Sequence, residues 1–353
     1  MDLRERLAAQ IAATGPLSLA QYMTICLHDP QAGYYATRPG LGAAGDFITA
    51  PLVSQMFGEL IGLWAAATWQ AMGSPSPFRL VEMGPGDGTL MADLLRAGRT
   101  LPGFVEAAEL WLVEVSAPLR RLQAERLEEA APQWADSLDA VPVGAPMILV
   151  ANELLDCLPT QQFVRTEKGW AERMVGLNEA GELVFGLSAP LPPDGRHGEV
   201  GAVFETSPAQ AALGAQIGAR LAADGGAALL IDYGPAAGEA GGDTFQALKG
   251  HEKVDPLACP GQADLTFHAD FPAVALAAKA EGATAAPLLT QAEFLRRLGI
   301  EARAQALATA RPERAAQVGR QFDRLTAPDQ MGALFKVLCL HGPGLVPPAF
   351  EAD

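Results

Sequence analysis

Short apolar segments of strand length alternate with helical segments along most of the chain. The apolar segments are FRLVEM (78–83), ELWLVEV (109–115), PMILVANE (146–153) and GAALLIDYG (226–234). The first is followed by TLMADLLRA (89–97), in which Leu90, Met91, Leu94 and Leu95 fall on one helix face. Strands that alternate with helices indicate βαβ units, so the pattern predicts an α/β fold with a parallel sheet and right-handed crossovers.

The N-terminal region is predicted to be helical at both of its ends. Leu3, Leu7 and Ile11 recur at the spacing of one helix face, and Val53–Trp69 is predicted to be a second, more buried helix. Between them lies the segment 33–51, which is too rich in glycine and proline for a helix. Loops of this length inside a compact chain are usually functional or disordered.

The segment 162–188 alternates apolar with polar residues and contains the turn sequences EKG and NEAG, which predicts an antiparallel β insertion. A last strand is predicted at 334–340. The expected organisation is a helical cap with a loop at 1–76, followed by a core at 77–353 that carries the β insertion at about 162–205.

The composition excludes two classes of protein. Hydrophobic residues make up 49% of the 353 residues, which is enough to bury a core and excludes a wholly disordered chain. The chain has 25 Lys and Arg against 41 Asp and Glu, and its net charge is −16. Because affinity for nucleic acid comes from clustered cations, no nucleic-acid partner is expected. A macromolecular partner should be basic, although acidity also serves solubility.

The cysteines and the apolar runs predict a cytoplasmic protein. The four cysteines form no CxxC pair, so neither a disulfide scaffold nor a zinc ribbon is indicated. The longest apolar run lies between Glu59 and Gln70 and is too short for the roughly 20 residues that cross a bilayer, so no membrane insertion is expected. The first residues, MDLRERLAAQIAATG, resemble neither a secretory signal nor a transit peptide.

The sharpest local signal is the sequence VEMGPGDG (81–88), which follows a predicted strand and precedes a predicted helix. Glycines there allow a tight turn and let a ligand approach the backbone. A dinucleotide fold uses GxGxxG, whose third glycine would fall at Thr89, whereas the glycines here are Gly84, Gly86 and Gly88.

Glu82 distinguishes two ligand classes for this loop. Its carboxylate would repel a pyrophosphate but attract the ammonium of an amino-acid moiety. S-adenosylmethionine (SAM) carries such an ammonium and no phosphate, so electrostatics favour SAM over NAD. A glycine turn without a ligand is the remaining interpretation.

Polar residues follow the other predicted strands, and ligands of open α/β sheets bind at the carboxyl ends of strands. Glu114 could accept both hydroxyls of a ribose in a SAM or an NAD site, or be an ordinary exposed carboxylate. Asp136 could accept a hydrogen bond from the adenine amino group. Asn152, Glu153 and Asp232 follow two further strands and suit a substrate pocket.

No metal site is predicted. Asp264, His268 and Asp270 lie close together in the sequence, but this spacing alone is weak evidence for a metal, and a pocket wall or a core histidine is the favoured interpretation. Tyr34 and Tyr35 are interpreted as packing residues that could line a site entrance.

Many separated motifs, in one order, resemble the MidA-type SAM-dependent methyltransferases. The family includes a mitochondrial complex I assembly factor that methylates an arginine of a NADH dehydrogenase subunit. The resemblance runs from about Tyr22 to Val337. The motifs are GDFITAP (45–51), VEMGPGDGTLMADLLR (81–96), LVEVSAPLR (112–120), ANELLDCLPTQQF (151–163), IDYG (231–234), GDTFQAL (242–248), GQADLTFHADF (261–271), TQAEFLRRLGI (290–300) and MGALFKV (331–337).

The resemblance implies a class I, Rossmann-like methyltransferase core with a seven-stranded sheet and SAM as cofactor. It implies symmetric dimethylation of a protein arginine, on a NADH dehydrogenase subunit during complex I assembly. A methyltransferase for another protein or a small molecule, or a chaperone that binds SAM without turnover, are the alternatives. The oligomeric state stays open.

Carried over position by position, the resemblance assigns roles to individual residues. Cofactor binding falls to Gly45, Asp46, Thr49, Pro51, Glu82, Gly84, Pro85, Gly86, Gly88, Glu114 and Asn152. The residues that flank the methyl donor are Asn152, Glu153, Asp156 and Pro159. The chain departs from the family pattern at Leu52, which is often Glu, at Asp87, which is often Arg, and at Cys157, which is usually Ala.

Arginine is a poor nucleophile because its guanidinium is delocalised and stays protonated. A carboxylate can hold it in bidentate fashion and draw positive charge away from the attacking nitrogen. Glu153 is the first candidate for this catalytic role, beside Asn152, with Asp156 and Asp232 as further candidates. Glu205 is a reserve, and a carboxylate that complements a helix dipole is the alternative interpretation of Glu153.

Overall fold

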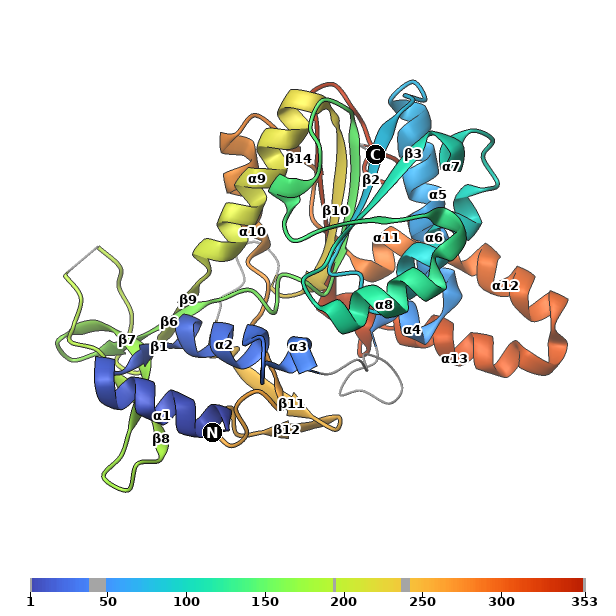
Figure 1. Ribbon diagram of the computed structural model, residues 1–353. Helices are drawn as coiled ribbons and strands as arrows, with labels where there is room; N and C mark the ends of the chain where they lie inside the picture. The colour runs from blue at the N-terminus through green and yellow to red at the C-terminus, as the bar shows by residue number, and fades with distance from the viewer. Residues whose placement is uncertain (1, 38–48, 193–194, 236–241, 352–353) are drawn as a thin grey trace.

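The computed structural model describes residues 2–37, 49–192, 195–235 and 242–351. These residues form a large open sheet covered by helices, and a second lobe built from N-terminal helices and two small antiparallel sheets (Figure 1). The two parts meet at the carboxyl ends of the parallel strands, which is where the candidate site lies.

The large sheet has a path of seven strands in the order β14–β16–β10–β5–β2–β3–β4. The five strands from β10 to β4 are parallel, and β16 runs antiparallel to both of its neighbours. The strands are β2 (Phe78–Met83), β3 (Ala108–Val113), β4 (Gln133–Ala135), β5 (Met147–Asn152), β10 (Gly226–Tyr233), β14 (Thr284–Ala285) and β16 (Phe335–His341). An eighth strand, β15 (Leu289–Thr290), also pairs with β16. The predicted α/β class and the path of seven strands are confirmed.

Both faces of this sheet are buried, which explains why its strands are continuous apolar runs. Leu229 and Ile231 of β10 belong to one hydrophobic cluster, and Ala228 and Leu230 belong to the cluster on the opposite face. The first face is covered by α5 (Gln55–Ala71) and α6 (Thr89–Gly98), and the second by α9 (Pro208–Asp224) and α10 (Phe271–Ala280).

Six further helices of the described residues surround this core. They are α7 (Phe104–Ala107), α8 (Ala117–Arg126), α11 (Gln291–Arg297), α12 (Ile300–Ala310), α13 (Ala315–Thr326) and α14 (Met331–Leu334). α8 crosses below the ends of β2 and β3, and α12 and α13 form a hairpin that projects from the body (Figure 1).

The second lobe contains the predicted β insertion. Its five-stranded antiparallel sheet has the path β1–β7–β6–β9, with β8 paired to β7. The strands are β1 (Leu17–Ser18), β6 (Gln161–Thr166), β7 (Gly169–Leu177), β8 (Leu183–Leu187) and β9 (Val203–Thr206). A three-stranded sheet of β11 (Gln246–Lys249), β12 (Glu252–Val254) and β13 (Asp264–Thr266) was not predicted.

The N-terminal residues divide between the two parts of the molecule. α1 (Leu3–Thr14) and α2 (Leu19–His28) share a hydrophobic cluster with the insertion, followed by the short α3 (Tyr34–Thr37). In contrast, α5 packs in the main core, preceded by α4 (Ala50–Val53). The expected unit 1–76 therefore differs from the arrangement found, because α5 buries its apolar face against α6 and the main sheet.

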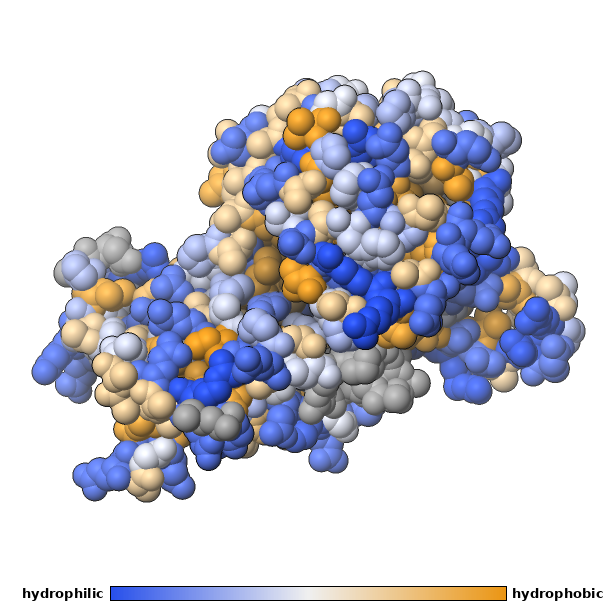
Figure 2. Space-filling model, viewed as in Figure 1, coloured by the Kyte–Doolittle hydropathy of each residue, from blue (hydrophilic) through white to orange (hydrophobic). Residues whose placement is uncertain are grey.

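The molecular face shown in Figure 2 is mostly hydrophilic, and strongly hydrophilic residues lie over α8. No helix in the described ranges is both long enough and apolar enough to cross a membrane.

Candidate functional site

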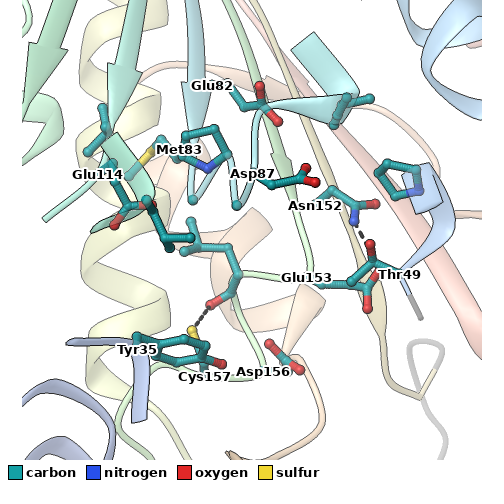
Figure 3. Close-up of a pocket in the computed structure, with 18 of the residues that line it drawn as sticks. Tyr35, Thr49, Glu82, Met83, Asp87, Glu114, Asn152, Glu153, Asp156 and Cys157 are labelled. Carbon is teal, nitrogen blue, oxygen red and sulfur yellow. Dashed lines mark hydrogen bonds between the residues drawn. The ribbon is translucent and has the colours of Figure 1, made fainter. Parts of the chain in front are cut away.

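A cavity of about 360 Å³ lies at the carboxyl ends of β2, β3 and β5, with α3 and β13 contributing residues from the second lobe (Figure 3). Most of the predicted site residues line it. They are Thr49, Pro51, Glu82, Gly84, Pro85, Gly86, Glu114, Asp136, Asn152, Glu153 and Asp156. The predicted residues Gly45 and Asp46 lie outside the described residues. Gly88 and Asp232 do not line the cavity.

The glycine loop between β2 and α6 adopts a backbone that favours glycine. Gly84, Gly86 and Gly88 have φ values of +64°, +54° and +82°. A Cβ added at Gly84 would lie 3.1 Å from Cδ1 of Leu154, so a side chain there would also crowd the loop after β5. Gly88 is the N-cap of α6 and packs on α8 instead of facing the cavity.

Asp87, where the family pattern often has Arg, does not leave a free charge in this loop. Its carboxylate forms an ion pair with Arg126 at 2.6 Å and accepts a hydrogen bond from the backbone of Thr89 at 3.0 Å. The departure therefore ties the start of α6 to α8.

Glu82 presents an unpartnered carboxyl group to the cavity. The residue is only 2% exposed, and its Oε2 is buried without a hydrogen-bond partner among the described residues. Burial raises the pKa of Glu82 well above its ordinary value, and the neighbouring Asp87 and Glu114 add to this. A cationic group would relieve this cost, which fits the ammonium of SAM.

Glu114 lies at the end of β3, where a ribose acceptor was predicted (Figure 3). Its Oε1 accepts a hydrogen bond from the backbone of Ser116 at 2.8 Å, and its Oε2 accepts one from the side chain of Gln123 at 3.3 Å. Burial raises the pKa of Glu114, while these donors act in the opposite direction. Gln123 was not identified from the sequence. It could have been found as a polar residue at a helix position where Leu119 and Leu127 indicate an apolar face.

Asp136 lines the cavity from the end of β4, as expected for a residue near an adenine. Its side chain is 83% exposed and forms an ion pair with Arg120 at 2.6 Å. Asp136 therefore lies at the rim of the cavity.

Glu153 directly follows β5 in a strained backbone conformation, with φ at +54°. Such strain in a residue other than glycine costs of order 1–3 kcal/mol and is common at functional sites. Its Oε1 accepts hydrogen bonds from Nδ2 of Asn152 at 3.0 Å and from the backbone of Ala50 at 3.2 Å. Burial raises the pKa of Glu153 to about 7, and Asp156 contributes to the increase.

Asn152 holds Glu153 through its amide nitrogen and keeps its oxygen available. Its Oδ1 is buried without a partner among the described residues. An unpaired buried acceptor is costly unless a ligand donates to it. Asn152 Oδ1 and Glu82 Oε2 are thus two acceptors in this cavity that a bound cofactor or substrate could satisfy.

Asp156 lines the cavity, whereas Asp232 lies behind it. Burial raises the pKa of Asp156 to about 6, while a hydrogen bond from Tyr233 acts in the opposite direction. Asp232 is fully buried, and its Oδ2 accepts from the backbone of Leu155 at 2.8 Å and of Asp156 at 3.2 Å. The structure therefore gives Asp232 a different place from the predicted catalytic one, because its oxygens are directed to backbone N–H groups.

The second lobe completes the wall of the cavity. Tyr35 donates a hydrogen bond from its hydroxyl to Oδ1 of Asp264 at 2.9 Å, and both residues line the cavity. His28 also lines it, and burial lowers the pKa of this histidine. In the described parts of the chain, no group of three His, Cys, Asp or Glu side chains is arranged to hold a metal.

The cavity wall carries many acids and few bases. Seven carboxyl side chains line it, and no Lys or Arg is among the described lining residues. They are Glu82, Asp87, Glu114, Asp136, Glu153, Asp156 and Asp264. A cavity of this kind suits cationic ligands and disfavours phosphates.

Comparisons with known proteins agree with this geometry. A family of S-adenosyl-L-methionine-dependent methyltransferases matches residues 60–288. A Danio rerio protein named protein arginine methyltransferase NDUFAF7, mitochondrial, is 37% identical, over 95% of this chain and 86% of its own length. The Homo sapiens protein of the same name is 34% identical, over 94% and 81%.

A solved structure with the same fold contains the product form of the cofactor. It is a Burkholderia thailandensis protein bound to S-adenosyl-homocysteine, with a TM-score of 0.87 and 29% identity, covering 99% of this chain and 93% of that one.

Proposed function

This chain belongs to the family of S-adenosyl-L-methionine-dependent methyltransferases, and from that premise we propose that it methylates an arginine side chain of a protein. The observation that carries the proposal is the acidic cavity, in which Glu153 is held in a strained conformation next to the glycine loop. A guanidinium is always charged and presents a planar fork of N–H donors that matches carboxylates, so arginine is the protein side chain that suits such a cavity best.

SAM, when bound, supplies an electrophilic methyl group on a positively charged sulfonium. The glycine loop at Gly84 and Gly86 would let it approach the backbone, and Glu82 would take its ammonium group. Glu114 would accept from the ribose hydroxyls, and Asp136 at the rim would accept from the adenine amino group.

On the substrate side, Glu153 and Asp156 would hold the guanidinium between them. Both line the cavity, and Asp156 lies close enough to Glu153 to contribute to the raised pKa of Glu153. A guanidinium held by two carboxylates is oriented by several N–H bonds, which fixes the attacking nitrogen. The unpaired Oδ1 of Asn152 is a further acceptor for such a bond.

Arginine methylation releases one proton, because the product guanidinium keeps its charge and the sulfonium becomes a neutral thioether. Glu153, whose pKa is raised to about 7, is placed to receive this proton from the attacking nitrogen. Its role is then twofold: orientation of the guanidinium and acceptance of the proton.

For the substrate, we propose a basic segment of a NADH dehydrogenase subunit, methylated to symmetric dimethylarginine. The net charge of −16 supports a basic partner, and the named relatives support arginine as the acceptor. The cytoplasmic location stays a prediction.

The test is to incubate the purified chain with labelled SAM and an extract rich in NADH dehydrogenase subunits, and then to identify the labelled product by mass spectrometry. A label on an arginine of such a subunit supports the proposal, and fragmentation distinguishes symmetric from asymmetric dimethylation. A label on a small molecule or another residue type contradicts it. Binding of SAM without any transfer would indicate a chaperone.

A further inference from the structure

We propose that Gln123 of α8 is a positioning residue that holds Glu114 and the glycine loop in the arrangement that recognises the ribose of the cofactor. The inference rests on the role predicted for Glu114 and does not depend on which molecule accepts the methyl group.

Gln123 occupies a position that its helix pattern would give to an apolar residue. It lies four residues after Leu119 and four before Leu127, and both leucines are buried. Gln123 itself has no exposed surface. A buried amide is costly unless its donors and acceptor are paired, so its contacts explain its presence here.

The orientation of this amide is fixed by Trp134 of β4. The indole Nε1–H of Trp134 lies 2.9 Å from Oε1 of Gln123 and can only donate. The amide oxygen must therefore face Trp134, and the amide nitrogen must face the opposite way. No other assignment satisfies both groups.

The amide nitrogen of Gln123 contacts two parts of the cofactor site. Nε2 donates to the backbone oxygen of Gly86 at 2.7 Å and to Oε2 of Glu114 at 3.3 Å. One side chain thus joins the loop after β2, the end of β3 and the strand β4, three segments that converge only in the folded chain.

These contacts matter because Glu114 must be both ionised and correctly turned to accept two ribose hydroxyls. Ser116 N holds Oε1 of the carboxylate, and Gln123 holds Oε2. Without Gln123, the carboxylate loses the side-chain donor that orients its Oε2, and the carbonyl of Gly86 is left without this partner. The ribose would then meet a misplaced acceptor.

The experiment compares two ligands by calorimetry: S-adenosyl-homocysteine and its deoxy counterpart, whose 2′,3′-dideoxyribose lacks both hydroxyls. We expect the unmodified protein to prefer the ribose ligand at least tenfold, because sites built for a hydroxyl reject analogues that lack it. Gln123→Met should bind S-adenosyl-homocysteine at least tenfold more weakly and bind the deoxy ligand almost as before. The preference would then fall to near one.

Two further variants keep the test decisive. Gln123→Glu keeps an acceptor for Trp134 but has no NH2 group, so it should lose the preference even if Gln123→Met does not fold. Gln291→Met is the matched control, because Gln291 is also a fully buried amide and donates to the backbone oxygen of Leu325, away from the cavity. It should retain the preference for ribose whatever its melting temperature.

Loss of the preference in the Gln123 variants and its retention in Gln291→Met support the inference. An equal loss of affinity for both ligands indicates a merely structural role and overturns it, as does unchanged binding. Glu114→Gln is measured in parallel: if it loses the preference while the Gln123 variants keep it, the role of Glu114 stands and that of Gln123 falls.

Discussion

Glu153 accepts a hydrogen bond from the backbone N–H of Ala50 at 3.2 Å, although 103 residues separate the two in the sequence. The contact fixes the strained residue after β5 against α4, whose Pro51 lines the same cavity. The carboxylate proposed to hold the substrate is therefore positioned by the segment that borders the cofactor site.

Glu153→Gln should abolish transfer and leave cofactor binding almost intact. Glutamine keeps an oxygen for Ala50 and Asn152, but it can neither balance a guanidinium charge nor take a proton. We expect SAM affinity to stay within a few-fold and kcat for an arginine peptide to fall by about 10²-fold or more. Calorimetry and a turnover assay measure the two quantities; unchanged turnover would remove Glu153 from the catalytic group.

The pKa of Glu153 also predicts how stability depends on pH. It is about 7 in the folded chain, against about 4.3 for an unfolded glutamate. The folded state thus binds this proton more tightly, so the contribution favours folding at pH 4 and is lost as the pH rises through 7. The unfolding free energy of the ligand-free protein should fall between pH 5 and 8.

Glu153→Gln should remove part of this pH dependence, of the order of 1–3 kcal/mol. Glu109→Gln is the control, because Glu109 lies on β3 with a 42% exposed side chain outside the cavity. Chemical denaturation at several pH values measures the slope. An identical slope in the parent chain and Glu153→Gln would contradict the predicted titration.

Glu82→Gln tests the proposed ammonium contact. The substitution should lower the affinity for S-adenosyl-homocysteine about tenfold or more, because a charged hydrogen bond is lost. The affinity for 5′-methylthioadenosine, which lacks the amino-acid moiety, should stay within about twofold of its value in the parent protein. If the affinities for both ligands fall equally, the ammonium does not bind at Glu82.

Asp232→Asn tests the structural place found for Asp232. Its two oxygens accept from the backbone of Leu155, Asp156 and Tyr233, and an asparagine offers only one oxygen. We expect a loss of about 1–3 kcal/mol in unfolding free energy. A variant with parental stability and no turnover would instead indicate a direct catalytic role.

Some of the site was visible in the sequence because it depends on local pattern. The strand–glycine–helix context placed Glu82 and Gly84 at the carboxyl end of β2, and the ends of the following strands placed Glu114 and Glu153 on the same edge. Parallel strands bring such residues together whatever their spacing along the chain.

Other features depend on contacts between distant segments, which no local pattern contains. Asp232 lies at the carboxyl end of a strand as Glu153 does, yet its Oδ2 accepts a hydrogen bond from the backbone of a loop 77 residues earlier. Tyr35 reaches Asp264 across 229 residues, and this contact closes the cavity from the second lobe.

The sequence by itself determined the sheet, the glycine turn and an acidic edge, since hydrophobic periodicity and backbone preference act over a few neighbouring residues. Only the tertiary structure decided which acids face the cavity and which are turned inward. That choice depends on which donors lie within hydrogen-bond distance once segments distant in the sequence have packed together, as the buried amide of Gln123 illustrates.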